Sequence, residues 1–129
     1  MTTATGTFTV RAWDEAPYEE RDGGAKLTRA AVTLAFSGDL EAEATVQWLM
    51  SYAPDGTAAF VGLQLVAGTL GGRAGSFVLQ DVGTFAGGVA RGAWSILAGS
   101  GAGDLAGISG SGSFEAGQDA IYSLDYEAG

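Results

Sequence analysis

Two polar residues stand inside apolar, strand-like stretches of this chain. Gln64 occurs in GLQLV and Asp81 in LQDVG, where amide and carboxyl side chains are uncommon if the strand is buried. Burial raises the pKa of an aspartic acid, so Asp81 would suit a general acid or base, with Gln64 donating a hydrogen bond to the substrate. The alternative is structural: the two side chains form a satisfied hydrogen-bonded pair that fixes the strand register.

Large apolar side chains accompany this pair on the same predicted strand face. Trp13, Trp48 and Trp94, together with Tyr52 and Tyr122, could form an aromatic wall for a ligand, although aromatic residues also pack inside barrels that bind nothing. Several glycines on this face are expected to leave one level of the interior without side chains. The residues that we expect to contact a ligand are Trp48, Trp94, Met50, Phe60, Tyr52, Tyr122, Gly62, Gly83, Gly92 and Gly110.

The missing residue types restrict the chemistry. The chain has no Cys and no His, which excludes thiol nucleophiles, Ser-His-Asp systems and the usual zinc or copper ligands. The acidic run between Asp14 and Asp22, which includes Glu15, lacks the spacing of a calcium loop and is expected to be solvated. The stretch GSGAGDLAGISGSGSF does not match the dinucleotide-binding pattern. We therefore expect no metal and no cofactor.

Charge and hydropathy limit the partners and the location. The formal net charge is −9, and the six Lys and Arg residues are scattered. Because no basic surface is predicted, we expect neither nucleic acid nor an anionic membrane as a partner. The start MTTATGTFTV lacks the basic and apolar regions of a signal peptide, and no apolar run is long enough for a membrane helix. We expect a cytoplasmic protein.

Alternation of apolar and polar residues with a period of two dominates the chain. Short connections rich in Gly, Asp and Pro separate the alternating stretches. This pattern predicts an all-β fold: one domain over residues 1–129, formed by a single eight-stranded antiparallel up-and-down barrel of calycin-like type. The acidic segment 14–25 is expected to be a loop and a candidate flap over one barrel end. The expected strands are roughly 5–13, 27–37, 40–53, 57–70, 75–85, 89–98, 105–115 and 119–127.

Hairpin turns predict which inward-facing residues lie opposite one another. We expect turns at PDG (54–56), at Gly72-Arg73 and at Gly87-Gly88, and a connection AGSGAG before the seventh strand. The resulting pairs are Trp48 with Gly62, Gly62 with Gly83, Gln64 with Asp81, Gly83 with Gly92, Asp81 with Trp94, Gly92 with Gly110 and Trp94 with Ile108.

The opposite, outward face is apolar over the third to fifth expected strands. A patch of this kind on the outside of a barrel is typical of a subunit interface. We therefore expect a homo-oligomer. The patch comprises Leu49, Val61, Leu63, Leu65, Val78 and Val82.

Four blocks of the sequence resemble a known family. They are GTFTVRAWDEAPYEE, LTRAAVTLAFSGDLEAEATVQWLM, DGTAAFVGLQLVAGTLGGRAGSFVLQDVGTF and GSGAGDLAGISGSGSF with the later YSLDY. Together these blocks resemble the bacterial domain-of-unknown-function 3224 family, which is similar in fold to allene oxide cyclase and dirigent proteins. The resemblance implies an eight-stranded barrel with a lumen, often in an oligomer, and no agreed reaction.

The resemblance also bears on the central polar pair. In that family an acid commonly stands at the position of Gln64 and a histidine at that of Asp81, so this chain departs from the pattern and has lost or changed the chemistry of the pair. Barrels of this shape guide cyclisations without a cofactor by holding a reactive chain folded. We therefore expect a barrel that binds a small apolar, polyketide- or lipid-like metabolite and acts as a cofactor-independent cyclase or isomerase. The alternatives are a non-catalytic carrier, or a filled structural barrel acting through its outer surface.

Overall fold

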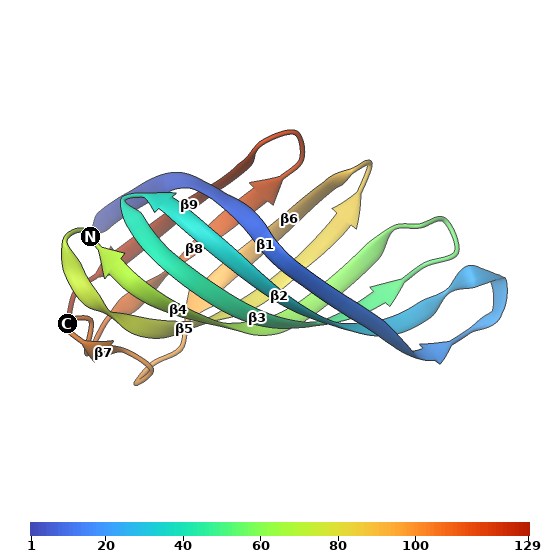
Figure 1. Cartoon of the computed structure of the whole chain (residues 1–129), viewed down its shortest axis with the longest axis horizontal. Coiled ribbons are helices and arrows are strands. Elements are labelled where there is room, and N and C mark those ends of the chain that lie inside the picture. The colour runs from blue at the N-terminus through green and yellow to red at the C-terminus, as the bar shows by residue number, and fades with distance from the viewer.

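The computed structural model describes residues 1–129 as one closed, antiparallel β-barrel (Figure 1). Eight strands follow one another around the barrel in the order β1-β2-β3-β4-β5-β6-β8-β9, and β9 pairs with β1 to close it. The expected all-β fold and eight-stranded antiparallel barrel are confirmed. The strands are β1 Thr2–Glu20, β2 Lys26–Gly38, β3 Leu40–Tyr52, β4 Ala58–Leu70, β5 Arg73–Ala86, β6 Val89–Ile96, the two-residue β7 Ala102–Gly103, β8 Ser109–Ala116 and β9 Ala120–Glu127.

Alternating burial explains why these segments are strands. In β3, Val46, Trp48 and Met50 are buried, and Gln47 and Leu49 between them point outward. Successive side chains of a strand point to opposite faces, so this pattern places one set in the barrel and the other outside. No helix is long and apolar enough to cross a membrane.

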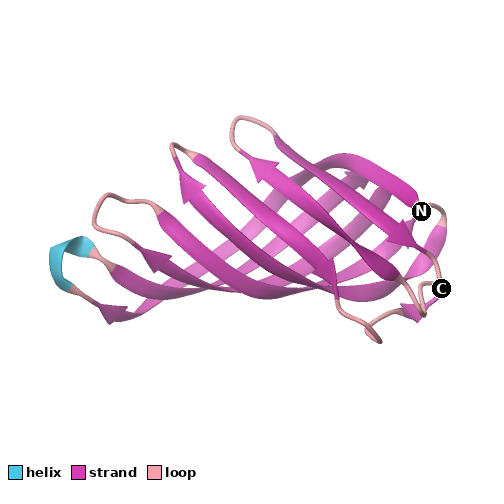
Figure 2. Ribbon diagram, turned by 180° about the vertical axis from the view of Figure 1, so that it is seen from behind, coloured by secondary structure: helices cyan, strands magenta, loops and turns pink.

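The two ends of the barrel differ. Both chain termini and the segment 97–108 lie at one end, which we call the closed end (Figure 1). There Leu105 and Ile108 are almost fully buried and belong to the hydrophobic core, and we call these two residues the plug. The turns 21–25, 53–57, 87–88 and 117–119 lie at the other, open end, and a short 3-10 turn (Asp22–Gly24) forms the tip of the longest hairpin (Figure 2).

The prediction of a loop at residues 14–25 is wrong, because β1 continues to Glu20 and pairs with β2 as far as Lys26. The pairing of β1 with β9 ends at Thr7, so the rest of β1 has a strand neighbour on one side only. Pro17 is tolerated on such an edge because its missing N–H would not pair with another strand. The acidic residues and the proline predicted a loop, whereas they lie on the free edge of a projecting two-stranded hairpin.

The β4–β5 register differs from the prediction by two residues. The turn residues are Gly71 and Gly72, with φ of 57° and 83°, and Leu70 pairs with Arg73. A two-residue hairpin turn of this kind requires positive φ at both positions, which two glycines satisfy and an arginine would not. Consequently the predicted pairs of Gly62 with Gly83 and Gln64 with Asp81 are wrong. The pairs are Gly62 with Asp81, Phe60 with Gly83 and Gln64 with Leu79.

The β6–β8 register also differs from the prediction. The connection 97–108 is longer than expected and contains β7, which pairs with the beginning of β5. Gly92 therefore pairs with Phe114 and Trp94 with Gly112, in place of Gly110 and Ile108. Ile108 belongs to the plug of the closed end. The other predicted hairpin pairs are confirmed: Trp48 with Gly62, Asp81 with Trp94 and Gly83 with Gly92.

Three of the four glycines of the predicted row, Gly62, Gly83 and Gly92, are covered by aromatic rings and do not leave an empty level. A Cβ atom at Gly62 would lie 2.5 Å from the Trp48 ring, and one at Gly83 would lie 2.5 Å from the Phe60 ring. The Phe114 ring covers Gly92 in the same way. The predicted continuous row of glycines does not form, because Gly62 and Gly83 are not paired. The space at these glycines is filled by the rings of Trp48, Phe60 and Phe114.

Candidate functional site

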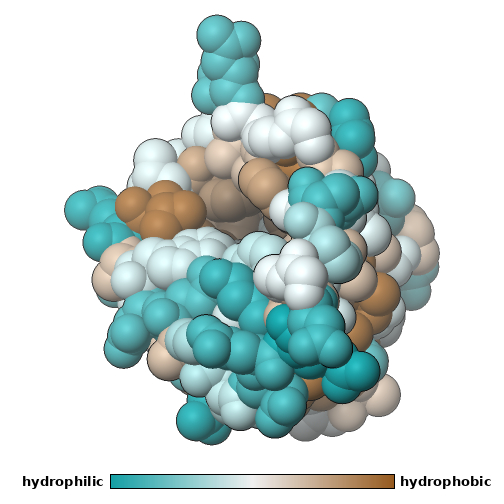
Figure 3. Space-filling model, turned by 90° about the vertical axis from the view of Figure 1, so that its right-hand side faces the viewer, coloured by the Kyte–Doolittle hydropathy of each residue, from teal (hydrophilic) through white to brown (hydrophobic).

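An apolar pocket of about 250 Å³ lies at the open end of the barrel. Figure 3 views this end and shows a hollow with hydrophobic residues inside it. Of the predicted ligand-contacting residues, Trp48, Met50, Tyr52 and Phe60 line the pocket. The full lining is Phe8, Val10, Trp13, Leu34, Trp48, Met50, Tyr52, Phe60, Phe85, Ala90, Phe114 and Ala116.

Sequence reasoning left three phenylalanines out of the ligand-contacting set. Phe8, Phe85 and Phe114 line the pocket, and inward alternation was the available signal for the first two. Alternation from Gly110 turns Phe114 inward too, but only the correct β6–β8 register places it beside Gly92. The predicted contacts Trp94, Tyr122, Gly62, Gly83, Gly92 and Gly110 do not line this pocket.

A β-bulge in β1 turns Trp13 into the pocket wall and Glu15 to the same face of the strand. The register of β1 against β2 shifts between Val10 and Ala12, which leaves Arg11 as an extra residue. After this shift Trp13 pairs with Val32 and Glu15 with Ala30, whose side chains face inward. An extra residue reverses the facing of the strand beyond it.

Trp13 lies against the wall of the pocket. Its ring centroid is 5.7 Å from that of Trp48, and its side chain lines the pocket while remaining 47% exposed. A half-exposed indole at this place forms one side of the mouth. The distance falls in the range of favourable aromatic pairs.

Glu15 is not itself a lining residue, but it accepts three hydrogen bonds beside the pocket, two of them from the lining residues Trp13 and Tyr52. Thr28 Oγ1 and Tyr52 OH donate to its Oε2 atom at 2.6 and 2.7 Å, and Trp13 Nε1 donates to Oε1 at 3.0 Å. Partial burial raises the pKa of Glu15, but these hydrogen bonds and the positive charge of Lys26 outweigh burial and lower it. Burial and the bond to Glu15 raise the pKa of Tyr52 to about 12. The prediction of a solvated Glu15 is therefore wrong.

Asp81 lies in the same cross-strand row as Trp48, in a buried polar cluster outside the pocket lining. Trp48 Nε1 donates to its Oδ2 atom at 2.9 Å, and Gln64 Nε2 donates to the same atom at 3.2 Å. Asp81 and Gln64 are fully buried. Burial raises the pKa of Asp81 to about 6, although the two hydrogen bonds lower it in part. The side chains of Gln64 and Asp81 are thus in contact, as predicted. They are diagonal neighbours on β4 and β5, because Asp81 pairs directly with Gly62.

Three polar atoms of this cluster have no hydrogen-bond partner: Asp81 Oδ1, Gln64 Oε1 and Trp94 Nε1. Unpaired buried polar atoms are uncommon in proteins. Neither Asp81 nor Gln64 lines the pocket. Trp48 connects the two regions, because its ring forms part of the pocket wall and its N–H group binds Asp81. No group of three or more acidic side chains is placed to hold a metal ion.

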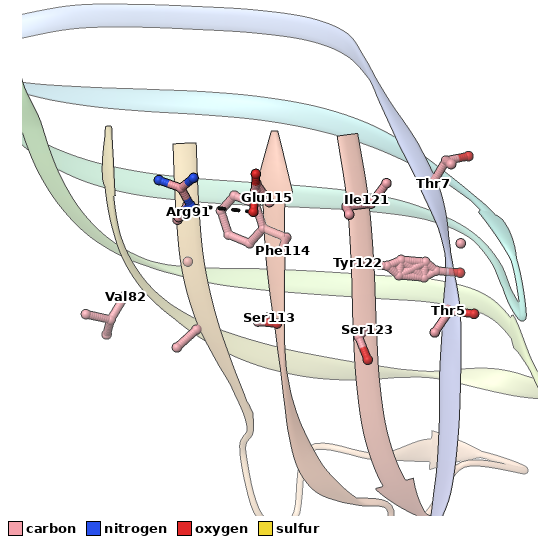
Figure 4. A pocket seen from close by; sticks show the side chains of 13 residues that line it. Thr5, Thr7, Val82, Arg91, Ser113, Phe114, Glu115, Ile121, Tyr122 and Ser123 are labelled. Carbon is pink, nitrogen blue, oxygen red and sulfur yellow. Dashed lines mark ion pairs between the residues drawn. The ribbon is translucent and has the colours of Figure 1, made fainter. Parts of the chain in front are cut away.

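The outer surface carries an apolar face and a groove that adjoins it at Val82. Leu49, Val61 and Val82 form one row across β3, β4 and β5, flanked by Leu63 and Leu65. These five side chains are each 49–53% exposed, and Val78 is more covered. The groove crosses the outside of β5, β6, β8, β9 and β1, and an Arg91–Glu115 ion pair of 3.5 Å lies in it (Figure 4). The sequence did not predict the groove.

The fold and the site define the class of this protein: a closed, eight-stranded antiparallel β-barrel with an aromatic pocket at one end. The model of a family described as "Protein of unknown function (DUF3224)" matches residues 4–126. The chain belongs to this family. It is also similar to a crystal structure from Shewanella oneidensis, of a DUF3224 family protein with unknown function.

The Shewanella protein shares 31% sequence identity with this chain and superposes with a TM-score of 0.81. The match covers 100% of this chain and 98% of the Shewanella chain. No curated protein matches. Because both matches are to proteins of unknown function, they establish the family and the fold and assign no reaction.

Proposed function

We propose that the protein binds a small apolar molecule in the aromatic pocket at the open end of the barrel. The observation that carries this proposal is the lining, which is made only of apolar and aromatic residues around about 250 Å³. Ligand pockets are typically concave and mostly apolar. Because an engineered cavity of about 150 Å³ holds benzene, this pocket would hold about ten non-hydrogen atoms, the size of naphthalene.

The test is a titration with naphthalene, followed by NMR of the indole N–H groups. We expect the Trp48 signal to shift and saturate, because its ring lines the pocket. Ala90→Leu would place a larger side chain in the pocket and weaken binding by at least about tenfold. Ala67→Leu is the matched control, because Ala67 lies on the outward face of β4. Equal binding by the two variants, or no saturable shift in the unmodified protein, would contradict the proposal.

Catalysis by Asp81 is a second candidate. The observation that favours it is a buried carboxyl group with an unpartnered Oδ1 atom, bonded to a tryptophan of the pocket wall. In a cofactor-independent cyclase or isomerase, Asp81 would take a proton from the substrate and return it, and Gln64 would donate a hydrogen bond. The substrate would have to pass the rings of Trp48 and Phe60 in the pocket wall to reach Asp81.

A ketone of pocket size tests this second candidate. The protein would be incubated with 2-tetralone in heavy water, and replacement of the α-hydrogen atoms by deuterium followed by NMR. If Asp81 acts as the base, exchange is faster with the protein than without it, and Asp81→Asn abolishes the difference. Exchange of the bound ketone at the uncatalysed rate would exclude this role.

We further propose that the chain associates with a second copy of itself through the apolar outer face. No charged residue occurs in β4, and the outward side chains of β5 between Ala74 and Thr84 are all uncharged. Copies of a chain with net charge −9 repel one another. An uncharged apolar face is the surface on which two copies can meet without like-charge contacts.

Light scattering over a range of concentrations tests the association. We expect an oligomer for the unmodified chain and a monomer for Leu63→Glu. Ile121→Glu is the matched control, because Ile121 is equally exposed but lies on β9. A monomer at high concentration in the unmodified protein would refute the proposal.

A further inference from the structure

We propose that the molecule bound in the pocket carries a positively charged amine at its outer end, which pairs with Glu15. This inference rests on the proposed function, because it assumes that the pocket binds a ligand, and it goes further by naming the chemical class: a small aryl- or alkylammonium ion. Three observations at the pocket mouth support it.

The first observation is the unfilled capacity of the Glu15 carboxylate. Each carboxylate oxygen offers two acceptor positions. Oε2 accepts from Thr28 and Tyr52, whereas Oε1 accepts only from Trp13. One position on Oε1 therefore remains, next to a tryptophan that lines the pocket. An N–H donor on the ligand would fill it.

The second observation is that Glu15 has no ion-pair partner. The two ion pairs of the structure, Met1–Glu127 and Arg91–Glu115, lie elsewhere. Lys26 is the cation that acts on Glu15 through space, but its Nζ atom lies over the Tyr52 ring, 5.0 Å from the ring centroid. A half-buried carboxylate that lacks a paired cation is a binding partner for a charged donor.

The third observation is the chemistry around the carboxylate. Trp13, Trp48 and Tyr52 line the pocket, and Trp13 and Tyr52 also bond to Glu15. Ammonium ions are attracted to the faces of such aromatic rings. The position of Lys26 over Tyr52 shows that one ring at the mouth already contacts a cation. Aromatic rings with one carboxylate favour an ammonium group over a carboxylate group.

The charges around the pocket opening also favour a cationic ligand. The projecting hairpin and the neighbouring turn carry an excess of acids, so the field at the mouth is negative and disfavours an anionic ligand such as a fatty acid. The acids are Asp14, Glu15, Glu19, Glu20, Asp22 and Asp55, against the bases Arg21, Lys26 and Arg29.

Three ligands with the same ring system test the inference: naphthalene, 1-naphthylmethylamine and 1-naphthoate. We expect the amine to bind roughly ten- to a hundredfold more tightly than naphthalene, the range of a charge-assisted hydrogen bond, and the naphthoate to bind more weakly. Glu15→Gln keeps the shape of the side chain but removes its charge, so the amine should lose this advantage while naphthalene binds as before. Glu20→Gln is the control, because it removes the same charge from an exposed position of the same strand.

The outcomes separate the inference from the proposed function. If naphthalene binds and the amine is no better, the inference is wrong and the apolar pocket stands. If naphthoate binds best, Lys26 is the polar contact and the inference is also wrong. If none of the three binds, the proposed function fails with it. If Glu20→Gln reduces the advantage of the amine as much as Glu15→Gln does, the effect is a general attraction and not a contact with Glu15.

Discussion

Replacing Asp81 by asparagine should stabilise the protein at neutral and alkaline pH. The pKa of Asp81 is raised from 3.8 to about 6, mainly by burial. The unfolded chain therefore releases this proton at a lower pH than the folded chain does. As the pH rises from 3.8 to about 6, the charge on Asp81 increasingly favours the unfolded state. Above that pH the destabilisation is complete.

The size of the effect follows from the shift. A difference of about two pKa units corresponds to about 3 kcal/mol of unfolding free energy, at about 1.4 kcal/mol per unit. Asparagine keeps an oxygen that accepts the hydrogen bonds of Trp48 and Gln64. Its NH₂ group also adds donors to a cluster in which the acceptor Gln64 Oε1 has no partner. For a domain of this length, the gain corresponds to a rise in Tm of about 10 °C.

The assay is urea unfolding of the unmodified protein and of Asp81→Asn between about pH 4 and pH 8. The variant should be more stable by about 3 kcal/mol at the alkaline end, and the difference should shrink steadily towards acid. Asp104→Asn, at an exposed position, measures the effect of simply removing one negative charge. A difference that does not change with pH, or a variant less stable at alkaline pH, would show that the hydrogen bonds of Asp81 outweigh its burial.

The other predictions concern the mouth, the glycines and the plug. Glu15→Gln should change the stability in the opposite sense to Asp81→Asn. Because the pKa of Glu15 is lowered, its charge stabilises the folded protein above the ordinary pKa of 4.5, and this stability is lost on acidification. In urea unfolding the variant should therefore be less stable than the unmodified protein at neutral pH and equally stable at low pH. A loss of unfolding free energy that is the same at all pH values would contradict this expectation. Gly92→Ala should destabilise by about 1–3 kcal/mol, since the Phe114 ring occupies the place of the new Cβ atom. Phe114→Leu in the same chain should recover part of the loss. Additive losses would disprove the contact. Leu105→Ala should cost about 2–5 kcal/mol in the same assay, because Leu105 is 1% exposed in the plug, and a loss below about 1 kcal/mol would mean that the closed end does not need it.

The sequence predicted the barrel because alternation with a period of two runs through nearly every strand. It predicted the register where a turn allowed a single placement, as at Gly87-Gly88, and failed where Gly71, Gly72 and Arg73 offered two. The shift of two residues moved Asp81 from Gln64 to Gly62. Placing a hairpin turn one residue too late thus shifts every cross-strand pair of that hairpin by two residues.

Part of the pocket lining was also predictable from the alternation of apolar and polar residues. Trp48, Met50, Tyr52 and Phe60 follow the regular alternation of β3 and β4, so their inward direction could be read from the sequence. Glu15 could not be placed in this way, because the bulge after Val10 interrupts the alternation of β1. Bulges of this kind have no clear sequence pattern, and this one positions the polar group of the site.

The free edge of β1 has a consequence for the behaviour of the protein in solution. Beyond Thr7 this strand presents unpaired N–H and C=O groups on the side away from β2, and such an edge can recruit a strand from another molecule into a growing sheet. Pro17 interrupts it, and Asp14, Glu19 and Glu20 surround it with negative charge. The same acids that favour an ammonium ligand thus keep molecules from joining edge to edge. Variants that neutralise several of them should form fibrillar aggregates more readily than the unmodified protein.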